Sequence, residues 1–284
     1  VLYGRRAVSI YRAPPDLVHK IAKICDDLIN KESPYITKFP FPLDGEDLKE
    51  QRHNGHFVTL KRMKDGSVRL IACAKRSYAE REPINLDFLD DQSKEGFEDF
   101  DEVIGVRHGV AQAFDVIYIR PSLGEVEVHI DMPCRMTYED IKNARKYYIG
   151  LIKKALPKEV VRESLDSPKN IFPMVRVFYG DSTGIINGLS HATGTSSLKE
   201  EKMRNKRQDL RSELFHKSGI DAVKTTDPYA IRIGWNVATG RNIPTIIVPG
   251  NSHLIGNAAA FVGHAILENC SGGRDYKFLM GKLS

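Results

Sequence analysis

One short stretch of the sequence alternates ionisable and apolar residues in a way that could hold a divalent metal. Every second residue of this stretch is an acid or an imidazole: Glu125, Glu127, His129 and Asp131. Residues two positions apart share one face of a β-strand. Carboxylates on a common face are typical ligands for the Mg²⁺ or Mn²⁺ that assists phosphodiester cleavage. The candidate metal ligands are Glu125, Glu127 and Asp131, and His129 is a candidate proton carrier; the alternative is an ordinary solvent-exposed strand face.

Basic residues concentrate between positions 199 and 217, where seven lysines and arginines stand against four acids. The capping pattern from Ser197 to Glu200 predicts a helix that begins here and ends near Gly219. Such a helix could contact the phosphates of a nucleic acid or another phosphorylated ligand, although the interleaved acids could equally pair with its charges. The candidate phosphate-binding residues are Lys202, Arg204, Lys206, Arg207 and Arg211.

The polar segment 190–197 precedes this predicted helix. A loop rich in glycine and hydroxyl groups at a helix N-terminus can hold an anion through backbone N–H groups. His191 lies in this segment and is a second candidate proton carrier. Together, these residues favour a protein that binds a nucleic acid or another phosphorylated ligand, and metal-dependent hydrolysis of a phosphodiester is the reaction that they could support.

A serine-containing turn suggests an alternative chemistry. The segment Phe178-Tyr179-Gly180-Asp181-Ser182-Thr183-Gly184 resembles the first motif of GDSL-type hydrolases, and the segment that begins at His253 resembles their C-terminal histidine motif. The resemblance implies a serine esterase with Ser182 as the nucleophile and His253 as its general base. The other interpretation of this segment is a simple turn that closes a strand.

Charge distribution supports a third hypothesis, a non-catalytic interaction protein. The 284 residues include 42 lysines and arginines and 37 acids, a mild excess that permits nucleic-acid partners. The segment 87–102 holds eight acids and one lysine, in contrast to residues 199–217, where basic residues predominate. The two segments could meet each other or a partner chain.

Membrane insertion is not expected, because no apolar run approaches the roughly 18 residues that a membrane-spanning helix needs. Four cysteines occur at long intervals with no CxxC pair, which favours reduced thiols in the cytoplasm. Disulfide pairing in a secreted protein remains the alternative.

Hydrophobic periodicity predicts the elements that position these residues. Helices are expected at 15–29 and 137–156, and β-hairpins at 56–73 and 113–131. We expect an α/β or α+β fold with a mixed sheet, β-hairpins and flanking helices. The chain divides into an N-terminal part, 1–162, and a C-terminal part, 170–284, with a single domain as the alternative. Further strands are expected at 7–11, 174–179, 229–235 and 245–248, and a small-residue helix at 253–269.

Overall fold

The computed structural model describes residues 4–51, 55–97, 99–158, 163–195, 197–237 and 242–284. Helices and strands are both abundant, which confirms the expected α/β class with hairpins and flanking helices. The strands are β1 (Arg5–Arg12), β2 (His56–Arg62), β3 (Val68–Pro83), β4 (Ile104–Arg120), β5 (Glu125–Met132), β6 (Ile185–Thr193), β7 (Leu198–Lys202), β8 (Thr226–Gly234), β9 (Thr245–Val248) and β10 (Ala265–Glu268). The helices are α1 (Pro15–Ile24), α2 (Pro34–Lys38), α3 (Gly45–Glu50), α4 (Asp91–Lys94), α5 (Tyr138–Ala155), α6 (Met174–Gly180), α7 (Leu214–Val223) and α8 (Gly273–Leu283).

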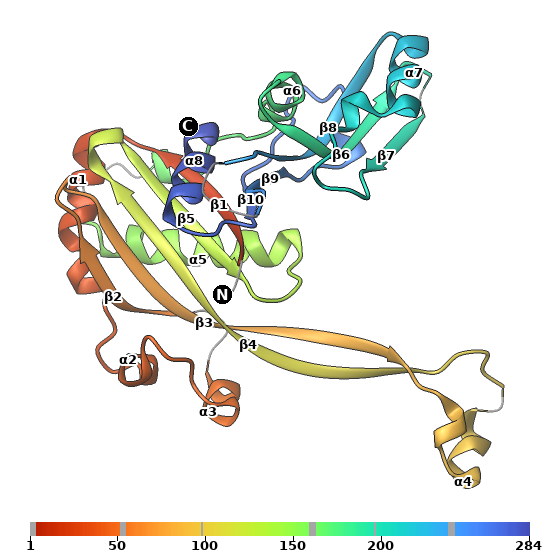
Figure 1. Cartoon of the computed structure of the whole chain (residues 1–284). Helices are drawn as coiled ribbons and strands as arrows, with labels where there is room; N and C mark the ends of the chain where they lie inside the picture. The colour runs from red at the N-terminus through yellow and green to blue at the C-terminus, as the bar shows by residue number, and fades with distance from the viewer. Residues whose placement is uncertain (1–3, 52–54, 98, 159–162, 196, 238–241) are drawn as a thin grey trace.

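Across the described residues, the strands form one sheet of ten strands in the order β2-β3-β4-β5-β1-β10-β9-β8-β6-β7 (Figure 1). Every neighbouring pair in this sheet is antiparallel, so the sheet is not the mixed one that the sequence predicted. The first strand lies in the middle and joins the two parts of the chain. Val8 is paired with His129 of β5 on one side and with Ala265 of β10 on the other. The sheet is therefore continuous through both parts that the sequence suggested.

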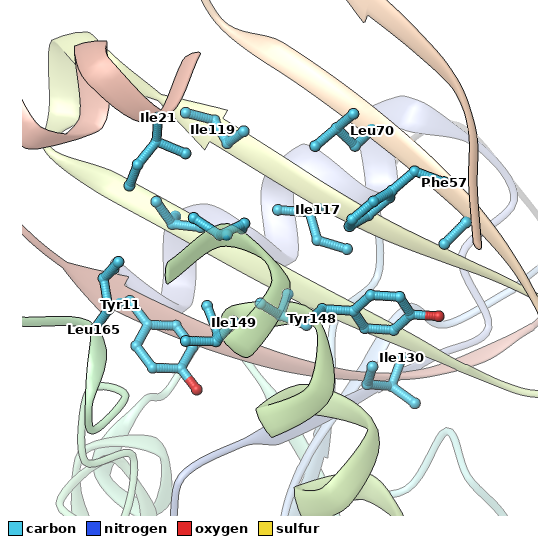
Figure 2. Packing of buried hydrophobic residues seen from close by; sticks show 14 of the residues in the cluster. Tyr11, Ile21, Phe57, Leu70, Ile117, Ile119, Ile130, Tyr148, Ile149 and Leu165 are labelled. Carbon is cyan, nitrogen blue, oxygen red and sulfur yellow. The ribbon is translucent and has the colours of Figure 1, made fainter. Parts of the chain in front are cut away.

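A hydrophobic core on one face of the sheet is covered by α1 and α5. Thr137 and Asp140 form a capping box at the start of α5, as the sequence predicted. Tyr148 and Ile149 of this helix pack against the strands, and Figure 2 shows them facing Ile117 and Ile130. Helical spacing thus gives α5 one apolar face that the sheet buries.

A second core lies on the other face of the sheet, beneath α6 and α8. Successive residues of β1 divide between the two cores: Ala7 joins the first core and Val8 the second. A central strand covered on both faces has little polar alternation. No helix among the described residues has the length and apolar character needed to cross a membrane.

Three predicted elements of the C-terminal part are wrong. The expected strand 174–179 is helix α6, because Val175 and Phe178 lie on one helical face that packs into the second core. The expected helix at 197–217 is instead strand β7, a single 3-10 turn and helix α7. Residues 198–202 pair with β6, and the Glu213 side chain caps α7 only from Leu214 onward.

The expected helix 253–269 is also absent. A short 3-10 turn, Ser252–Leu254, is followed by Gly256 at a φ of 67°, a left-handed conformation that suits glycine. The last part of this segment is β10, whose four residues are buried between β1 and β9. The sheet therefore recruits a stretch whose small residues suggested a helix, and the final helix, α8, was not predicted.

The longest hairpin leaves the sheet as an arm, which we define as residues 74–113 (Figure 1). Among the described residues, β3 pairs with β2 only as far as Cys73, and β4 pairs with β5 only from Val116 onward. The arm is therefore a two-stranded ribbon, paired from Ala74 with Ala113 to Pro83 with Ile104. Its end, residues 84–103, carries the acidic segment, and we call it the tip.

Candidate metal centre

The alternating acids of β5 do not form the wet strand face that the sequence suggested. Glu125, Glu127 and His129 are all at most 5% exposed. His129 Nε2 lies 2.9 Å from Glu127 Oε2, and Arg120 donates to Glu127 Oε1 at 2.8 Å. Burial would raise the pKa of Glu127, but the hydrogen bonds from His129 and Arg120 hold it below its usual value. The oxygens of the Glu127 carboxylate are therefore already paired with protein groups.

His129 is enclosed between β5 and the C-terminal helix. Burial lowers its pKa, and the neighbouring Glu127 only partly opposes this effect. The hydroxyl of Tyr276 in α8 contacts both ring nitrogens. The imidazole is thus neutral and packed, with a structural role in holding α8 on the sheet.

Asp131 holds the sheet together where the arm departs. Its carboxylate accepts a hydrogen bond from the Phe114 N–H at 2.9 Å, and the Asp115 carboxylate accepts one from the Asp131 N–H at 2.8 Å. These bonds replace the backbone ladder between β4 and β5, which ends at Val116 and His129. The buried Asp115 also accepts the Tyr148 hydroxyl at 2.7 Å and pairs with Arg76.

The three predicted metal ligands are instead held by arginines and by backbone. Arg120 lies 2.8 Å from Glu127 and 3.9 Å from Glu125, and Asp131 accepts the Phe114 N–H. In the part of the chain that the structure describes, one other group brings three ligand atoms within 4.8 Å of one another. Its members are His191, Glu201 and His216.

Two histidines converge on one carboxylate oxygen in this group. His191 Nε2 lies 2.9 Å from Glu201 Oε2, and His216 Nδ1 lies 2.7 Å from the same atom. The side chains of His191 and His216 are 5% and 2% exposed, whereas that of Glu201 is 17% exposed. Solvent therefore reaches the group from the Glu201 side. We call these three residues the candidate metal centre.

Strand pairing places His191 beside Glu201. In the β6–β7 register Leu189 is paired with Glu201 and His191 with Lys199, so His191 and Glu201 are diagonal neighbours on one face. Helix α7 brings the third residue, because the Glu213 carboxylate accepts the His216 N–H at 2.7 Å at the start of the helix. The sequence identified His191 but missed the other two, because it assigned the Glu201 segment to a helix.

The donor set fits a divalent transition metal. Two imidazoles and a carboxylate are typical zinc ligands, whereas Mg²⁺ prefers oxygen ligands. Bonds of about 2.0–2.1 Å in a tetrahedral site put ligand atoms about 3.3 Å apart, so a small opening of the present contacts would admit an ion. The donor set therefore suits Zn²⁺ or Mn²⁺ better than Mg²⁺. His191 Nδ1, the ring nitrogen that faces away from Glu201, is buried without a hydrogen-bond partner.

Helix α6 supplies a group that orients one histidine. The Tyr179 hydroxyl lies 3.1 Å from His216 Nε2, the ring nitrogen opposite the one that faces Glu201. An outer hydrogen bond of this kind fixes the orientation of a metal-binding imidazole. Tyr179 is thus a candidate positioning residue.

Four of the five predicted phosphate-binding residues are exposed on the end of β7 and the turn that follows it. Lys202 lies 2.7 Å from Glu200, and Lys206 Nζ donates to the Met203 carbonyl at 2.8 Å. Arg204 and Arg207 lie in the same turn. We call residues 199–207 the basic segment; it begins within strand β7 and contains Glu201.

Arg211, the fifth predicted phosphate-binding residue, binds backbone carbonyls of its own chain. Its guanidinium donates to the carbonyls of Tyr179, Asp181 and Gly184 at 2.7–3.1 Å, and it pairs with Asp209 at 2.6 Å. These bonds close the turn between α6 and β6. Arg211 therefore braces the fold instead of presenting its charge to a ligand.

The two residues of the esterase hypothesis are exposed on separate turns. Ser182 follows helix α6 and not the strand that the GDSL-type motif requires, and His253 lies in the 3-10 turn after β9. Among the described residues, no hydrogen bond joins them. The predicted anion-binding loop 190–197 is also changed, because residues 190–193 belong to β6, while Ser196 lies outside the described residues.

Two surface cavities lie elsewhere. One, of about 360 Å³, is lined by Arg76, Arg135 and Asp140 at the base of the arm, and the other, of about 290 Å³, by Arg176 and Asp227 among others. Neither is lined by a residue of the candidate metal centre.

Comparisons with known proteins do not assign the chain to a family. No known family model matches the chain, and no curated protein is significantly similar to it.

Proposed function

We propose that this protein is a metal-dependent hydrolase that cleaves phosphodiesters in a nucleic acid or another phosphorylated ligand. The proposal depends on one observation: His191, Glu201 and His216 converge at the point where the exposed basic segment begins. Two of the three metal ligands and the start of the basic segment thus occur on the hairpin β6–β7, and His216 of α7 completes the centre.

Each group has a separate part in this proposal. A divalent metal would polarise a phosphoryl oxygen and lower the pKa of a water molecule. His191, Glu201 and His216 would hold it, and Tyr179 would orient His216. Exposed lysines and arginines of the basic segment would attract and position the phosphate.

A cytoplasmic location is part of the proposal. All four cysteines are free, and Cys134 and Cys270 are partly exposed. Exposed thiols persist most readily in the reducing cytoplasm.

A cleavage assay tests the proposed function. Labelled single- and double-stranded DNA and RNA are incubated with the protein and Zn²⁺, Mn²⁺, Mg²⁺ or EDTA. We expect cleavage with Zn²⁺ or Mn²⁺ that EDTA abolishes, and a loss of about 100-fold or more in His216→Ala, since that variant lacks a metal ligand.

Two variants serve as controls in this assay. His253→Ala removes an exposed histidine outside the centre and should retain full activity, and Ser182→Ala should do the same. Cleavage that persists in EDTA and is lost in Ser182→Ala would instead support the serine esterase class. Absence of cleavage and of salt-sensitive binding with every probe would overturn the proposal.

A further inference from the structure

The base of the arm contacts residues 43–49, where Gln112 accepts the Leu43 N–H and Lys75 donates to the Lys49 carbonyl, but the arm beyond its base is a ribbon of two strands. Its strands pair only with each other from Ala74 and Ala113 outward, as far as the described residues show. Ile104 and Val106 lie exposed on one face of this ribbon, at 49% and 51%. Because an isolated two-stranded ribbon is only marginally stable in water, a surface that packs against this one would stabilise the arm.

The tip combines exposed aromatic rings with a strong negative charge. Phe88 is 88% exposed and Phe100 is 61% exposed. Large apolar groups in such numbers at one end of a molecule are typical of contact surfaces. The tip contains one lysine, Lys94. Its described acids are all exposed: Asp87, Asp90, Asp91, Glu95, Asp99, Asp101 and Glu102.

The same chain carries a surface with the complementary properties. Leu214 and Phe215, in the first turn of α7, are 78% and 75% exposed, and Leu198 of β7 is 54% exposed. The contact between His216 and Glu201 places this turn beside β7. Exposed basic residues occur in the same stretch of chain, residues 198–217, which we call the basic end: its exposed cations are Lys199, Lys202, Arg204, Lys206, Arg207 and Lys217.

We propose that the tip of one copy of this protein docks on the basic end of a second copy. Figure 1 shows that the arm carries the tip away from the sheet and away from the end of the molecule formed by β6, β7 and α7. The two complementary surfaces therefore meet between copies and not within one. Each surface combines exposed apolar side chains with charges, and the charges of the tip are opposite in sign to those of the basic end. This complementarity determines both the partner and its orientation.

This contact is of the head-to-tail kind. The tip of each copy meets a different surface on the next one, so association produces rings or open chains and not only a two-fold dimer. Both surfaces are strongly charged and exposed, so salt weakens the contact: the screening length falls from about 30 Å at 0.01 M salt to about 8 Å at 0.15 M.

Sedimentation velocity at several protein concentrations, at low and at high salt and with EDTA throughout, tests the proposal. We expect species larger than a monomer that increase with concentration at low salt and largely dissociate at high salt. EDTA makes this readout independent of the proposed metal-dependent function.

Charge reversal at each surface identifies the contact. Asp101→Lys with Glu102→Lys at the tip, and Arg204→Glu with Lys217→Glu at the basic end, should each give a monomer. When the two double variants are mixed, the unchanged tip of one meets the unchanged basic end of the other. We therefore expect association to return in the mixture alone.

A matched control separates this contact from a general effect of charge. Lys20→Glu with Lys23→Glu changes the charge on the exposed face of α1 by the same amount as the basic-end variant does. This variant should leave association intact. A monomer under all conditions, or equal association in the tip variant and the wild type, would overturn the proposal.

Discussion

At the residue scale, the properties of the candidate metal centre follow from one oxygen atom. Glu201 Oε2 accepts from His191 on one side and from His216 on the other. Three ligand atoms this close favour either a hydrogen-bonded cluster or an ion. The choice depends on what orients the rings, and Tyr179 is the partner of the outer nitrogen of His216.

The Tyr179→Phe variant measures this orienting effect. Removal of the hydroxyl frees His216 Nε2 but leaves all three metal ligands in place. We expect Zn²⁺ affinity to fall by about 10-fold, the range typical for the loss of an outer hydrogen bond. Competition against a chromophoric chelator gives the affinity, and Phe178, whose ring is buried next to Tyr179, keeps the helix packed. An unchanged affinity would contradict a positioning role.

A buried histidine outside the centre predicts acid sensitivity of the fold. Burial, assisted by the charge of Arg145, lowers the pKa of His264 from 6.5 to about 4. Between these values the unfolded chain binds a proton that the folded chain excludes. Stability is therefore complete above pH 6.5 and decreases by about 3 kcal/mol as pH falls through this window.

Urea unfolding from neutral pH to about pH 4 measures this decrease. In His264→Gln the decrease should become smaller by about the same 3 kcal/mol, because glutamine does not titrate. Exposed His19→Gln is the matched control and should behave like the wild type. A full pH dependence in His264→Gln would show that other groups cause it.

At the element scale, the arm begins where side chains replace backbone pairing. Asp115 is completely buried and binds Arg76, Tyr148 and the Asp131 N–H. Burial raises the pKa of Asp115, and the Arg76 charge and these hydrogen bonds oppose the change. The group is thus a buried ion pair that fixes the angle at which the arm leaves the sheet.

The Asp115→Ala variant should destabilise the protein strongly. It leaves the Arg76 guanidinium buried without its carboxylate, and such a change costs about 3–5 kcal/mol. The exposed pair of Asp227 and Arg176 supplies the control, because Asp227→Ala should cost less than about 1 kcal/mol. Equal unfolding free energies for the two variants would contradict a structural role for the buried pair.

Local signals predicted some elements well and failed for others. The capping box at Thr137 and the apolar face of α5 are encoded within the helix itself, so the sequence identified them. By contrast, the structures of α6 and β10 depend on distant parts of the chain. Helix α6 packs its apolar face into the second core, and β10 pairs with β1 on one side and with β9 on the other. Neither influence can be seen in a short window of sequence.

The candidate site shows the same limit of local reasoning. His191 stands out in the sequence, but Glu201 joins it only through the register of β6 and β7, and His216 only through the cap of α7. By contrast, the acids of β5 are conspicuous in the sequence because they alternate with apolar residues. Their role in the structure is to pair with arginines around a buried strand. Regular spacing predicted a shared face correctly but not what covers that face.

At the scale of the whole molecule, one continuous sheet separates two oppositely charged ends. The acidic tip is at the end of the arm, and the basic end surrounds the candidate metal centre. This arrangement explains how a chain with a formal net charge of only +5 can present strong local fields. The proposed hydrolase activity and the proposed self-association use the same basic end, so a polyanionic ligand and the tip of a second copy should compete for it.

Metal content tests the central claim most directly. The protein is dialysed against excess Zn²⁺, then against metal-free buffer, and its zinc is measured by mass spectrometry. We predict about one ion per wild-type chain and per His253→Ala chain, and almost none in His191→Ala or His216→Ala of unchanged circular dichroism. Zinc retained equally by all four proteins, or by none of them, would contradict the account.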